Sequence, residues 1–431
     1  MDQSIFSSDF KPEPYWWDRT PRPTALESSL PDQADVVIVG SGYTGLNAGL
    51  VTSRAGLSTV IVDAEQPGWG CSSRNGGQVS GEVKPSYKAL ARLHGPAQAY
   101  AIIAEARSAL RWVGDFINDE GIDCDYRHCG RFHAAHSAQQ YTTQKQEFKS
   151  QVKGLERDGH LVDKTQIKNE VDSPFYHGGL VISEHASLDP ARYHQGLYER
   201  ALASGCHVVD NCRVQNIVRN TDGFNLSTAK GQIRAGKVIV ATSGYTGSAT
   251  PWHQRRIIPI GSYMLATEML DPDLARSLIP NDRVVSDTRK LVVYYRLSPD
   301  GHRILFGARV SHKETDPISS AGPLRLEMLR IFPQLAGAKV THSWMGFVGY
   351  TFDKLPHLGE DNGLFYAMGY CGSGICLSSY FGHRLGQQAL GIPDATIPMN
   401  GLKFETRPFY HGNPWFLGPT IRYYQIRDRF N

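Results

Sequence analysis

The residues best suited to chemistry form a glycine-rich turn near the start of the chain, Gly40-Ser41-Gly42-Tyr43-Thr44-Gly45. The turn follows an apolar run, DVVIVG at 35–40, typical of a parallel strand buried on both faces. The pattern G-x-G-x-x-G between such a strand and a helix predicts a dinucleotide site. The first glycine makes the turn, the second admits the pyrophosphate to the backbone, and the third lets helix and strand pack closely. The helix N-terminus then directs unpaired N–H groups at the phosphates.

An acidic residue follows where such a site needs one. The helix predicted over 41–56 leads to a second strand, STVIVDA at 58–64, and Asp63 lies near its end, 18 residues after Gly45. A carboxylate at this position can bind the hydroxyl pair of a ribose. It would repel a 2′-phosphate, which disfavours NADP. The motif alone leaves FAD and NAD open.

A second glycine cluster comes directly after Asp63 and reads Gly68-Trp69-Gly70-Cys71-Ser72-Ser73-Arg74-Asn75-Gly76-Gly77-Gln78. Together with VIVGSGYTGLNAG it resembles the D-amino-acid-oxidase/glycine-oxidase superfamily of FAD enzymes, in which such a segment passes under the flavin. Three later segments extend the resemblance over most of the chain: ATSGYTG at 241–247, DKLPHLG at 353–359 and GYCGSGICLSSYFGHRLG at 369–386. The N-terminal YW, the RNGGQ and the ATSGYT are most similar to the branch of bacterial γ-glutamylputrescine oxidase-like enzymes.

The resemblance implies that FAD is the cofactor and that it is bound without a covalent link. Covalent branches place a His at the second cluster or a Cys in the strand before D-x-x-P, where this chain has Gly346-Phe347-Val348. The implied FAD contacts are Gly40, Ser41, Gly42, Tyr43, Thr44, Gly45, Asp63, Ala64, Gly70, Ser72, Ser73, Arg74, Asn75, Gly76, Gly77, Gln78, Val214, Ser243, Gly244, Gly346, Gly372, Ser373, Gly374 and Ile375. For Val214, a plain buried valine is the alternative, and for 372–375 an ordinary glycine-started helix.

The substrate side is predicted on a hairpin formed by 290–300 and 302–310. A carboxylate on the substrate would call for an arginine, whose fork binds it with two hydrogen bonds. The candidate catalytic residues are Tyr263, Tyr295, Arg296 and Arg309, with Tyr294 as a further candidate. Alternation along the strand puts Tyr294 and Arg296 on one face and Tyr295 on the other. For each arginine, a salt bridge on a sheet surface is the alternative.

We therefore expect an FAD-dependent oxidoreductase that oxidises the C–N bond of an amine or amino acid to an imine, which hydrolyses to an aldehyde or oxo acid. Sarcosine oxidases carry an oxygen-assisting lysine after the substrate hairpin, whereas this chain reads ILFGAR at 304–309. Electrons therefore pass either to oxygen, giving hydrogen peroxide, or to another acceptor. The alternatives are an NAD-dependent dehydrogenase and a non-catalytic binding protein with a flavoprotein fold.

The expected fold class is α/β: a Rossmann-like FAD-binding domain of the glutathione-reductase type, with an inserted substrate domain built on an antiparallel sheet. The predicted parts are an extended N-terminal arm at 1–33, the FAD-binding domain at 34–85, 180–250 and 350–400, the substrate domain at 86–179 and 251–349, and a C-terminal extension at 401–431. The proline density of the arm argues against a helix there.

Composition excludes several other classes. Lys and Arg number 45 against 42 Asp and Glu, without a basic block, so nucleic acid is not an expected partner. No apolar run is long enough for a membrane span and no signal peptide stands at the start. The seven cysteines form no C-x-x-C pair, which indicates a reducing, cytoplasmic setting. His133 and His136 point to opposite faces of a predicted strand, so no metal site is expected.

Overall fold

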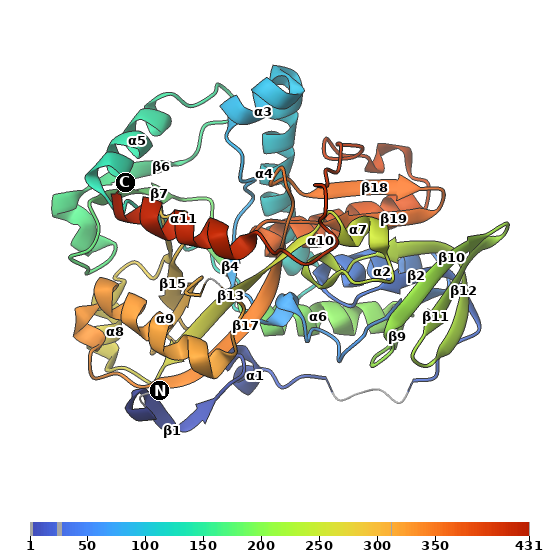
Figure 1. Ribbon diagram of the computed structural model, residues 1–431, viewed down its shortest axis with the longest axis horizontal. Helices are drawn as coiled ribbons and strands as arrows, with labels where there is room; N and C mark the ends of the chain where they lie inside the picture. Colours follow the sequence, from blue (N-terminus) through green and yellow to red (C-terminus); the bar gives the residue numbers. More distant parts are fainter. Residues whose placement is uncertain (1–2, 24–27, 312, 431) are drawn as a thin grey trace.

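The computed structural model describes residues 3–23, 28–311 and 313–430 of the chain. Within them the strands build two large sheets, and both ends of the chain lie on the side of the nine-stranded one (Figure 1). The other sheet has eight strands and a parallel centre, and it carries the glycine-rich turn. The predicted fold class, an α/β dinucleotide-binding domain with an inserted antiparallel-sheet domain, is confirmed by this arrangement.

The eight-stranded sheet is the base of the cofactor domain. Its strands are β2 Gln33–Val39, β3 Thr59–Val62, β9 His207–Val209, β10 Val214–Asn220, β11 Gly223–Thr228, β12 Gly231–Val240, β18 His357–Asp361 and β19 Leu364–Met368. Five of them run parallel in the order β19-β12-β2-β3-β9, and β10, β11 and β18 pair antiparallel at the edges. The carboxyl ends of β2, β3 and β12 are apolar and buried because both of their faces are covered.

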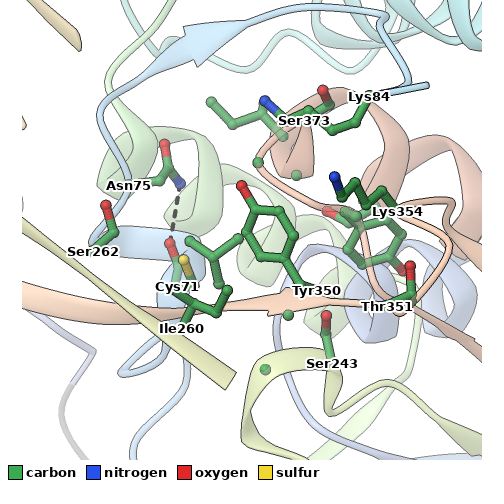
Figure 2. Close-up of a pocket in the computed structure, with 18 of the residues that line it drawn as sticks. Cys71, Asn75, Lys84, Ser243, Ile260, Ser262, Tyr350, Thr351, Lys354 and Ser373 are labelled. Atoms are coloured by element: carbon green, nitrogen blue, oxygen red, sulfur yellow. Dashed lines mark hydrogen bonds between the residues drawn. The ribbon is translucent and has the colours of Figure 1, made fainter. Parts of the chain in front are cut away.

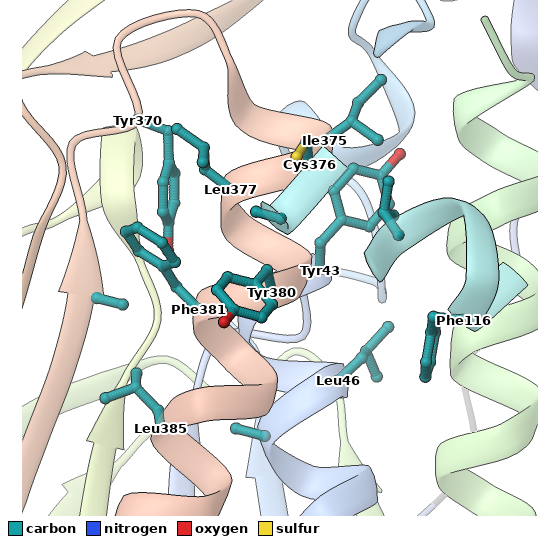
Figure 3. Close-up of a cluster of buried hydrophobic side chains, with 14 of the residues drawn as sticks. Tyr43, Leu46, Phe116, Tyr370, Ile375, Cys376, Leu377, Tyr380, Phe381 and Leu385 are labelled. Atoms are coloured by element: carbon teal, nitrogen blue, oxygen red, sulfur yellow. The ribbon is translucent and has the colours of Figure 1, made fainter. Parts of the chain in front are cut away.

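The helices of the described chain lie on the two sheets and at the junction between them (Figure 1). They are α1 Tyr15–Arg19, α2 Tyr43–Arg54, α3 Tyr87–His94, α4 Pro96–Asp119, α5 Ala138–Lys149, α6 Pro190–Ala203, α7 Pro251–Gln254, α8 Pro272–Leu278, α9 Pro317–Ile331, α10 Gly374–Ala389 and α11 Leu417–Phe430. Helices α2, α4, α6 and α10 share one apolar core on a face of the eight-stranded sheet. Figure 3 shows Leu385 of α10, Leu46 of α2 and Phe116 of α4 in this core.

The position of α4 differs from the predicted division at residue 86, which assigned this helix to the substrate domain. Its buried side chains, among them Ile102 and Leu110, pack into the core of the cofactor domain. A helical period identifies the face that is buried but not the sheet against which it packs. The boundary at 180 also cuts through a strand, because 178–182 pair within the nine-stranded sheet.

The glycine-rich turn connects β2 to α2 as predicted, and the backbone explains two of its glycines. Gly40 has φ +106°, a conformation that residues with a Cβ rarely adopt. A Cβ on Gly45 would lie 1.9 Å from the carbonyl oxygen of Gly40. The third glycine is therefore required by the packing of α2 on the turn, and the N-terminus of α2 is held at the end of β2.

The nine-stranded sheet forms the inserted domain. Its strands are β1 Phe6–Lys11, β5 Arg131–Ala134, β6 Gly159–Asp163, β7 Gly178–Ile182, β13 Ile258–Thr267, β14 Val284–Asp287, β15 Tyr294–Leu297, β16 Ile304–Ala308 and β17 Val340–Tyr350. Their order is β1-β17-β13-β16-β15-β14-β5-β7-β6, antiparallel except for the β1–β17 and β5–β14 pairs. The predicted hairpin of β15 and β16 is confirmed, with a turn closed by Gly301 N–H donating to Ser298 O at 2.8 Å. Two further short strands, β4 Gln78–Val79 and β8 Ala186–Ser187, pair with each other.

The N-terminal segment contains more structure than the predicted extended arm. It includes α1, so the prediction that proline excludes a helix is wrong. Pro14 stands at the N-cap, where its missing N–H costs no hydrogen bond, and Pro21 follows the last turn. The segment packs on the body of the protein by its aromatic side chains, because Tyr15 and Trp16 are buried. Residues 24–27 of the arm lie outside the described residues.

The C-terminal segment ends in α11, which lies across the junction of the two sheets (Figure 1). The carboxylate of Asp428 accepts hydrogen bonds from the backbone N–H groups of Lys290 (3.0 Å) and Leu291 (3.1 Å), which ties α11 to the segment after β14. Within the described ranges, none of the helices has the length and apolar character needed to cross a bilayer.

The contact at Gly45 predicts a large effect of one methyl group. Gly45→Ala is expected to lower the free energy of unfolding by about 3 kcal/mol, the upper end for overpacking, because the methyl group would overlap Gly40 O. Chemical denaturation measures the change. Gly337→Ala is the matched control, since a Cβ there meets no atom within 4 Å. Equal stability of the two variants would contradict this packing role.

Buried histidines predict a loss of stability in acid. Burial, reinforced by a neighbouring arginine in each case, lowers the pKa of His133, His253 and His383 to about 4. Below the usual pKa near 6.5 the unfolded chain takes up protons that the folded chain does not. The free energy of unfolding should therefore fall from pH 6.5 to 4, by about 1.4 kcal/mol per pH unit for each fully titrating histidine. Urea titrations at several pH values measure the slope. His383→Gln should make it shallower, and a pH-independent midpoint would contradict the prediction.

Candidate functional site

A single cavity of about 1880 Å³ runs between the two sheets. It begins at the glycine-rich turn, passes the second glycine cluster and the loop before α10, and ends at the far edge of the nine-stranded sheet, where β5 and β7 lie. Pockets for one small ligand usually measure about 300–1,000 Å³. This cavity therefore has room for an extended dinucleotide and a second small molecule.

Most of the predicted FAD contacts line this cavity. They are Gly40, Gly42, Tyr43, Thr44, Asp63, Ala64, Gly70, Ser72, Arg74, Asn75, Gly76, Gln78, Val214, Ser243, Gly244, Gly346, Gly372, Ser373, Gly374 and Ile375. They come from six separate stretches of chain, namely 40–44, 63–78, 214, 243–244, 346 and 372–375. Four of these stretches converge because the carboxyl ends of β2, β3, β12 and β19 meet at one edge of the parallel sheet.

The other four predicted contacts, Ser41, Gly45, Ser73 and Gly77, are absent from the cavity lining, which corrects their predicted placement. Each supports the lining from behind. Gly45 is enclosed by the packing of α2. The hydroxyl of Ser73 donates to Gly68 O at 2.5 Å, and the carbonyl of Gly77 accepts from Leu188 N–H at 2.9 Å.

Ser41 links the turn to the acidic residue. Its N–H and its hydroxyl both donate to Asp63 Oδ2, at 2.7 and 2.6 Å. Asp63 also lines the cavity. The first turn of α2 is held in a similar way, because the N–H of Tyr43 donates to Ser72 Oγ at 3.1 Å. The turn, the acid and the helix N-terminus thus form one hydrogen-bonded unit of the kind that binds a pyrophosphate and a ribose.

The loop 71–78 forms the wall on which a flavin ring would rest. Asn75 closes it, since Nδ2 donates to Cys71 O and Ser72 O, both at 3.1 Å, and Oδ1 accepts from Gly77 N–H at 2.9 Å. Figure 2 shows Asn75 and Cys71 on one side of this part of the cavity, with Tyr350 between them and Ser373. These bonds fix the backbone of the loop beside the cavity.

Three tryptophans from other segments hold the same loop from outside. The indole N–H of Trp16 donates to Asn75 O at 2.9 Å, that of Trp344 to Arg74 O at 2.7 Å, and that of Trp17 to Ser73 Oγ at 2.8 Å. Trp16 and Trp344 are fully buried. The N-terminal segment and β17 therefore fix the loop, and together with the two helix N-termini of α2 and α10 they make a cradle that fits FAD.

The opposite wall is one face of the nine-stranded sheet. Side chains alternate along each strand, so that β13 presents Ile260, Ser262 and Met264 to the cavity and β15 presents Tyr294. The hydroxyls of Tyr294 and Ser262 lie 2.9 Å apart. Burial raises the pKa of Tyr294 to about 12, so this phenol stays protonated at neutral pH.

Three of the four predicted catalytic residues lie outside the cavity lining, which corrects their predicted position. Tyr295 points into the core of the inserted domain, where its ring stacks on Phe306 and its hydroxyl donates to that of Tyr176 at 3.2 Å. Tyr263 is buried beside the same core. Arg296 shares a face with Tyr294, as predicted, but its Nη1 turns to backbone carbonyls on the cofactor domain.

Arg309 does line the cavity. Its Nη1 forms an ion pair with Glu314 at 2.8 Å and donates to Gly261 O at 2.7 Å. Tyr263 supports this pair, because its hydroxyl donates to Glu314 Oε2 at 2.7 Å. The positive charge of Arg309 is thus already matched, which corresponds to the salt-bridge alternative for this arginine.

The cavity has further walls that the sequence did not identify. At its far end lie Glu82, Arg131 and His133, whereas Lys84 lies beside Gly372 in the loop before α10. One side is closed by α11 with Thr420, Ile421, Tyr424 and Arg427 and by Phe416, which directly precedes this helix. The alternation within RFHAAHS was the available signal for Arg131 and His133 sharing a face. No motif marks α11, because its place over the cavity depends on tertiary packing alone. Among the described residues, no group of three or more His, Cys, Asp or Glu side chains could hold a metal ion.

Comparisons with known proteins agree with this geometry. The family of FAD dependent oxidoreductases named DAO matches residues 35–388. The chain belongs to this family. The oxidoreductase is 32% identical to the γ-glutamylputrescine oxidoreductase of Escherichia coli K12, over 92% of this chain and 93% of that protein. It is 28% identical to the probable oxidoreductase OrdL of Rhizobium meliloti, over 99% and 100% of the two chains.

Solved structures support the fold of the oxidoreductase. The glycine oxidase of Geobacillus kaustophilus superposes with a TM-score of 0.71, at 20% identity, over 88% of this chain and 99% of that one. The predicted family and the predicted cofactor, FAD, are confirmed by the family match and the relatives.

The hydrogen bonds of Arg296 predict that replacing this residue changes the affinity for FAD and not the affinity for substrate. Its Nη1 donates to Gly77 O (3.1 Å) and Leu188 O (2.8 Å), and hydrogen bonds from a charged donor contribute about 1.5–3 kcal/mol each. Arg296→Met should therefore weaken FAD binding by about tenfold or more, because the loop that includes Gly77 loses its anchor. Titration of the flavin-free protein with FAD measures this change.

Tyr295→Phe is the control for this experiment, since Tyr295 is adjacent in β15 but points to the opposite face. It should leave FAD affinity unchanged. Unchanged FAD affinity in Arg296→Met, together with a raised KM for a carboxylate-bearing amine, would restore Arg296 to the substrate site.

Proposed function

We propose that the oxidoreductase oxidises the C–N bond of a primary or secondary amine or an amino acid to an imine. The imine hydrolyses to an aldehyde or oxo acid, and the electrons pass to oxygen, giving hydrogen peroxide, or to another acceptor. The observation that carries this proposal is the shared cavity: the loops of the FAD cradle open directly on the side-chain face of β13 and β15. A small molecule on that face would lie against the cofactor ring.

The name of the γ-glutamylputrescine oxidoreductase supports an amine as the substrate class. The cofactor family supports FAD over the NAD-dependent alternative. The cavity argues against the non-catalytic alternative, since a mere binding scaffold would not need a cofactor cradle that opens on the side-chain face of β13 and β15.

The residues of the wall suit the oxidation of an amine. FAD, once bound, supplies the acceptor for a hydride and its two electrons. The protein must then orient a neutral amine with its hydrogen-bearing carbon toward the ring and keep water away. Met264 and Ile260 give the wall apolar contacts, while the Tyr294–Ser262 pair can donate a hydrogen bond to the substrate without taking its proton.

The side wall formed by α11 and the preceding Phe416 completes this environment. Phe416 and Ile421 bring apolar surface to the cavity, and Tyr424 brings a ring. We propose that FAD is held without a covalent bond, because the second glycine cluster contains no histidine and β17 no cysteine. Of the predicted catalytic residues we retain Arg309 as a candidate substrate contact and Tyr263 as a positioning residue for Glu314.

The oxidation of amines can be tested by anaerobic flavin bleaching. The purified protein should show flavin bands at about 370 and about 450 nm, and an amine substrate should bleach the longer-wavelength band. A panel of amines, N-methyl amino acids and γ-glutamylputrescine serves as the set of candidate donors. Repetition with oxygen and a peroxide assay, and separately with an artificial acceptor, identifies the acceptor. A flavin that is reduced by dithionite but by no member of the panel would contradict the proposed function.

A further inference from the structure

The far end of the cavity forms a polar chamber that the chemistry at the FAD cradle does not use. We define it by the six cavity-lining residues Glu82, Arg131, His133, Gln144, Arg157 and Ser286. Arg131 and His133 project from β5, Ser286 from β14 and Gln144 from α5. The wall that β13 and β15 present beside the cradle has no charged side chain, so this charged chamber is a chemically distinct end of the same cavity.

The pairing of β15, β14 and β5 in one sheet fixes the distance between the chamber and the reaction site. Tyr294 pairs with Ser286 across β15 and β14, and Ser286 pairs with His133 across β14 and β5. Their side chains therefore form one row on the cavity face of the sheet. Two strand spacings separate Tyr294 from His133, which is about 10 Å. An extended chain of about three residues would span that distance.

The chamber contains more positive charge than it neutralises. Arg157 forms an ion pair with Glu82 at 2.7 Å. Burial by itself would raise the pKa of Glu82, but the positive charge of Arg157 lowers it. This carboxylate is therefore ionised and already matched. His133 is neutral at physiological pH, since its pKa is about 4. Arg131 is attracted by the same carboxylate, so the chamber holds two guanidinium groups for one carboxylate and keeps an excess positive charge.

Arg131 has little to hold it in place among the described residues. Its Nη2 makes a long hydrogen bond of 3.4 Å to Gln78 Oε1, and its Nε is buried without a partner. A guanidinium withdrawn from water without partners costs free energy unless an anion compensates it. The Oε1 of Gln144 is likewise buried and unpartnered, while its Nε2 donates to His133 O at 2.9 Å. Unsatisfied donors and acceptors that line a cavity indicate a polar ligand.

We propose that the polar chamber binds a carboxylate at the far end of the amine substrate, with Arg131 as its anion contact. This inference rests on the proposed oxidation of an amine at the cradle. The substrate class is then an amine whose carboxylate lies about 10–12 Å from the reacting C–N bond, because Arg131 lies two strands from Tyr294 and two residues along β5 from His133. The chamber is a specificity site, separate from the residues that face the reacting carbon.

The first experiment compares two probes on the wild-type enzyme. γ-Glutamylputrescine carries a free carboxylate remote from its primary amine, and its carboxamide derivative differs only in that group. The enzyme should show a KM about ten- to a hundredfold lower for the carboxylate, the range expected for a charged hydrogen bond. Equal KM values for the two probes would overturn the proposal.

The second experiment removes the anion contact. In Arg131→Met the KM advantage of the carboxylate probe should shrink to less than about twofold, while kcat for the carboxamide stays within about twofold of wild type. Arg111→Met is the matched control, because Arg111 lies on the outer face of α4 and bonds only Ser108 among the described residues. This control should retain the full KM advantage. An unchanged advantage in Arg131→Met would overturn the proposal.

Binding without turnover gives an independent readout. N-butyl-γ-glutamylamide lacks the reacting amine but keeps the carboxylate, and it should perturb the flavin spectrum of the wild type with a Kd that rises at least about tenfold in Arg131→Met. Should Arg131→Met fail to fold, Arg131→Gln replaces it in both assays. Failure of every amine to reduce the flavin would count against the proposed function, whereas reduction by other amines but not by γ-glutamylputrescine would count against the chamber alone.

Discussion

The site depends above all on the hydrogen bonds that hold the backbone of the loop 71–78. This loop contains no strand or long helix before Gln78, so its carbonyl groups need partners from elsewhere. Trp16, Trp344 and Arg296 supply them from the N-terminal segment, β17 and β15. The loop therefore joins the cofactor domain to the inserted domain, and the cradle exists only when both domains are in place.

The position of the loop 71–78 between the two domains also explains why the cavity is continuous. The loop ends in β4, where Gln78 donates to backbone carbonyls of β14 and β15 and accepts from Arg131. One end of the loop thus faces the glycine-rich turn and the other faces the sheet of the inserted domain. A cofactor that binds on this loop therefore lies against the sheet of the inserted domain. The same cavity continues along that sheet to the polar chamber.

Strand alternation then decides which side chains can meet a substrate. On β15, Tyr294 faces the cavity and Tyr295 the core, and on β5 the residues Arg131 and His133 face the cavity while Phe132 is buried on the other side. A one-residue shift in register would exchange these roles. The division of the sheet's cavity face into an uncharged part on β13 and β15 and a charged part on β5 is therefore a property of the register of this sheet.

The sequence by itself determined the cofactor end of the molecule. Gly40 and Gly45 in the first turn and Asp63 are local patterns whose backbone requirements can be read from neighbouring residues, and they predicted the fold class and a dinucleotide site. The resemblance of the loop 71–78 to a known family then predicted FAD. The substrate end was decided by tertiary structure. Whether Arg296 faces a ligand or a carbonyl depends on Gly77 and Leu188, which are 219 and 108 residues away in the chain. The same holds for α11, since no local pattern encodes which surface a helix covers.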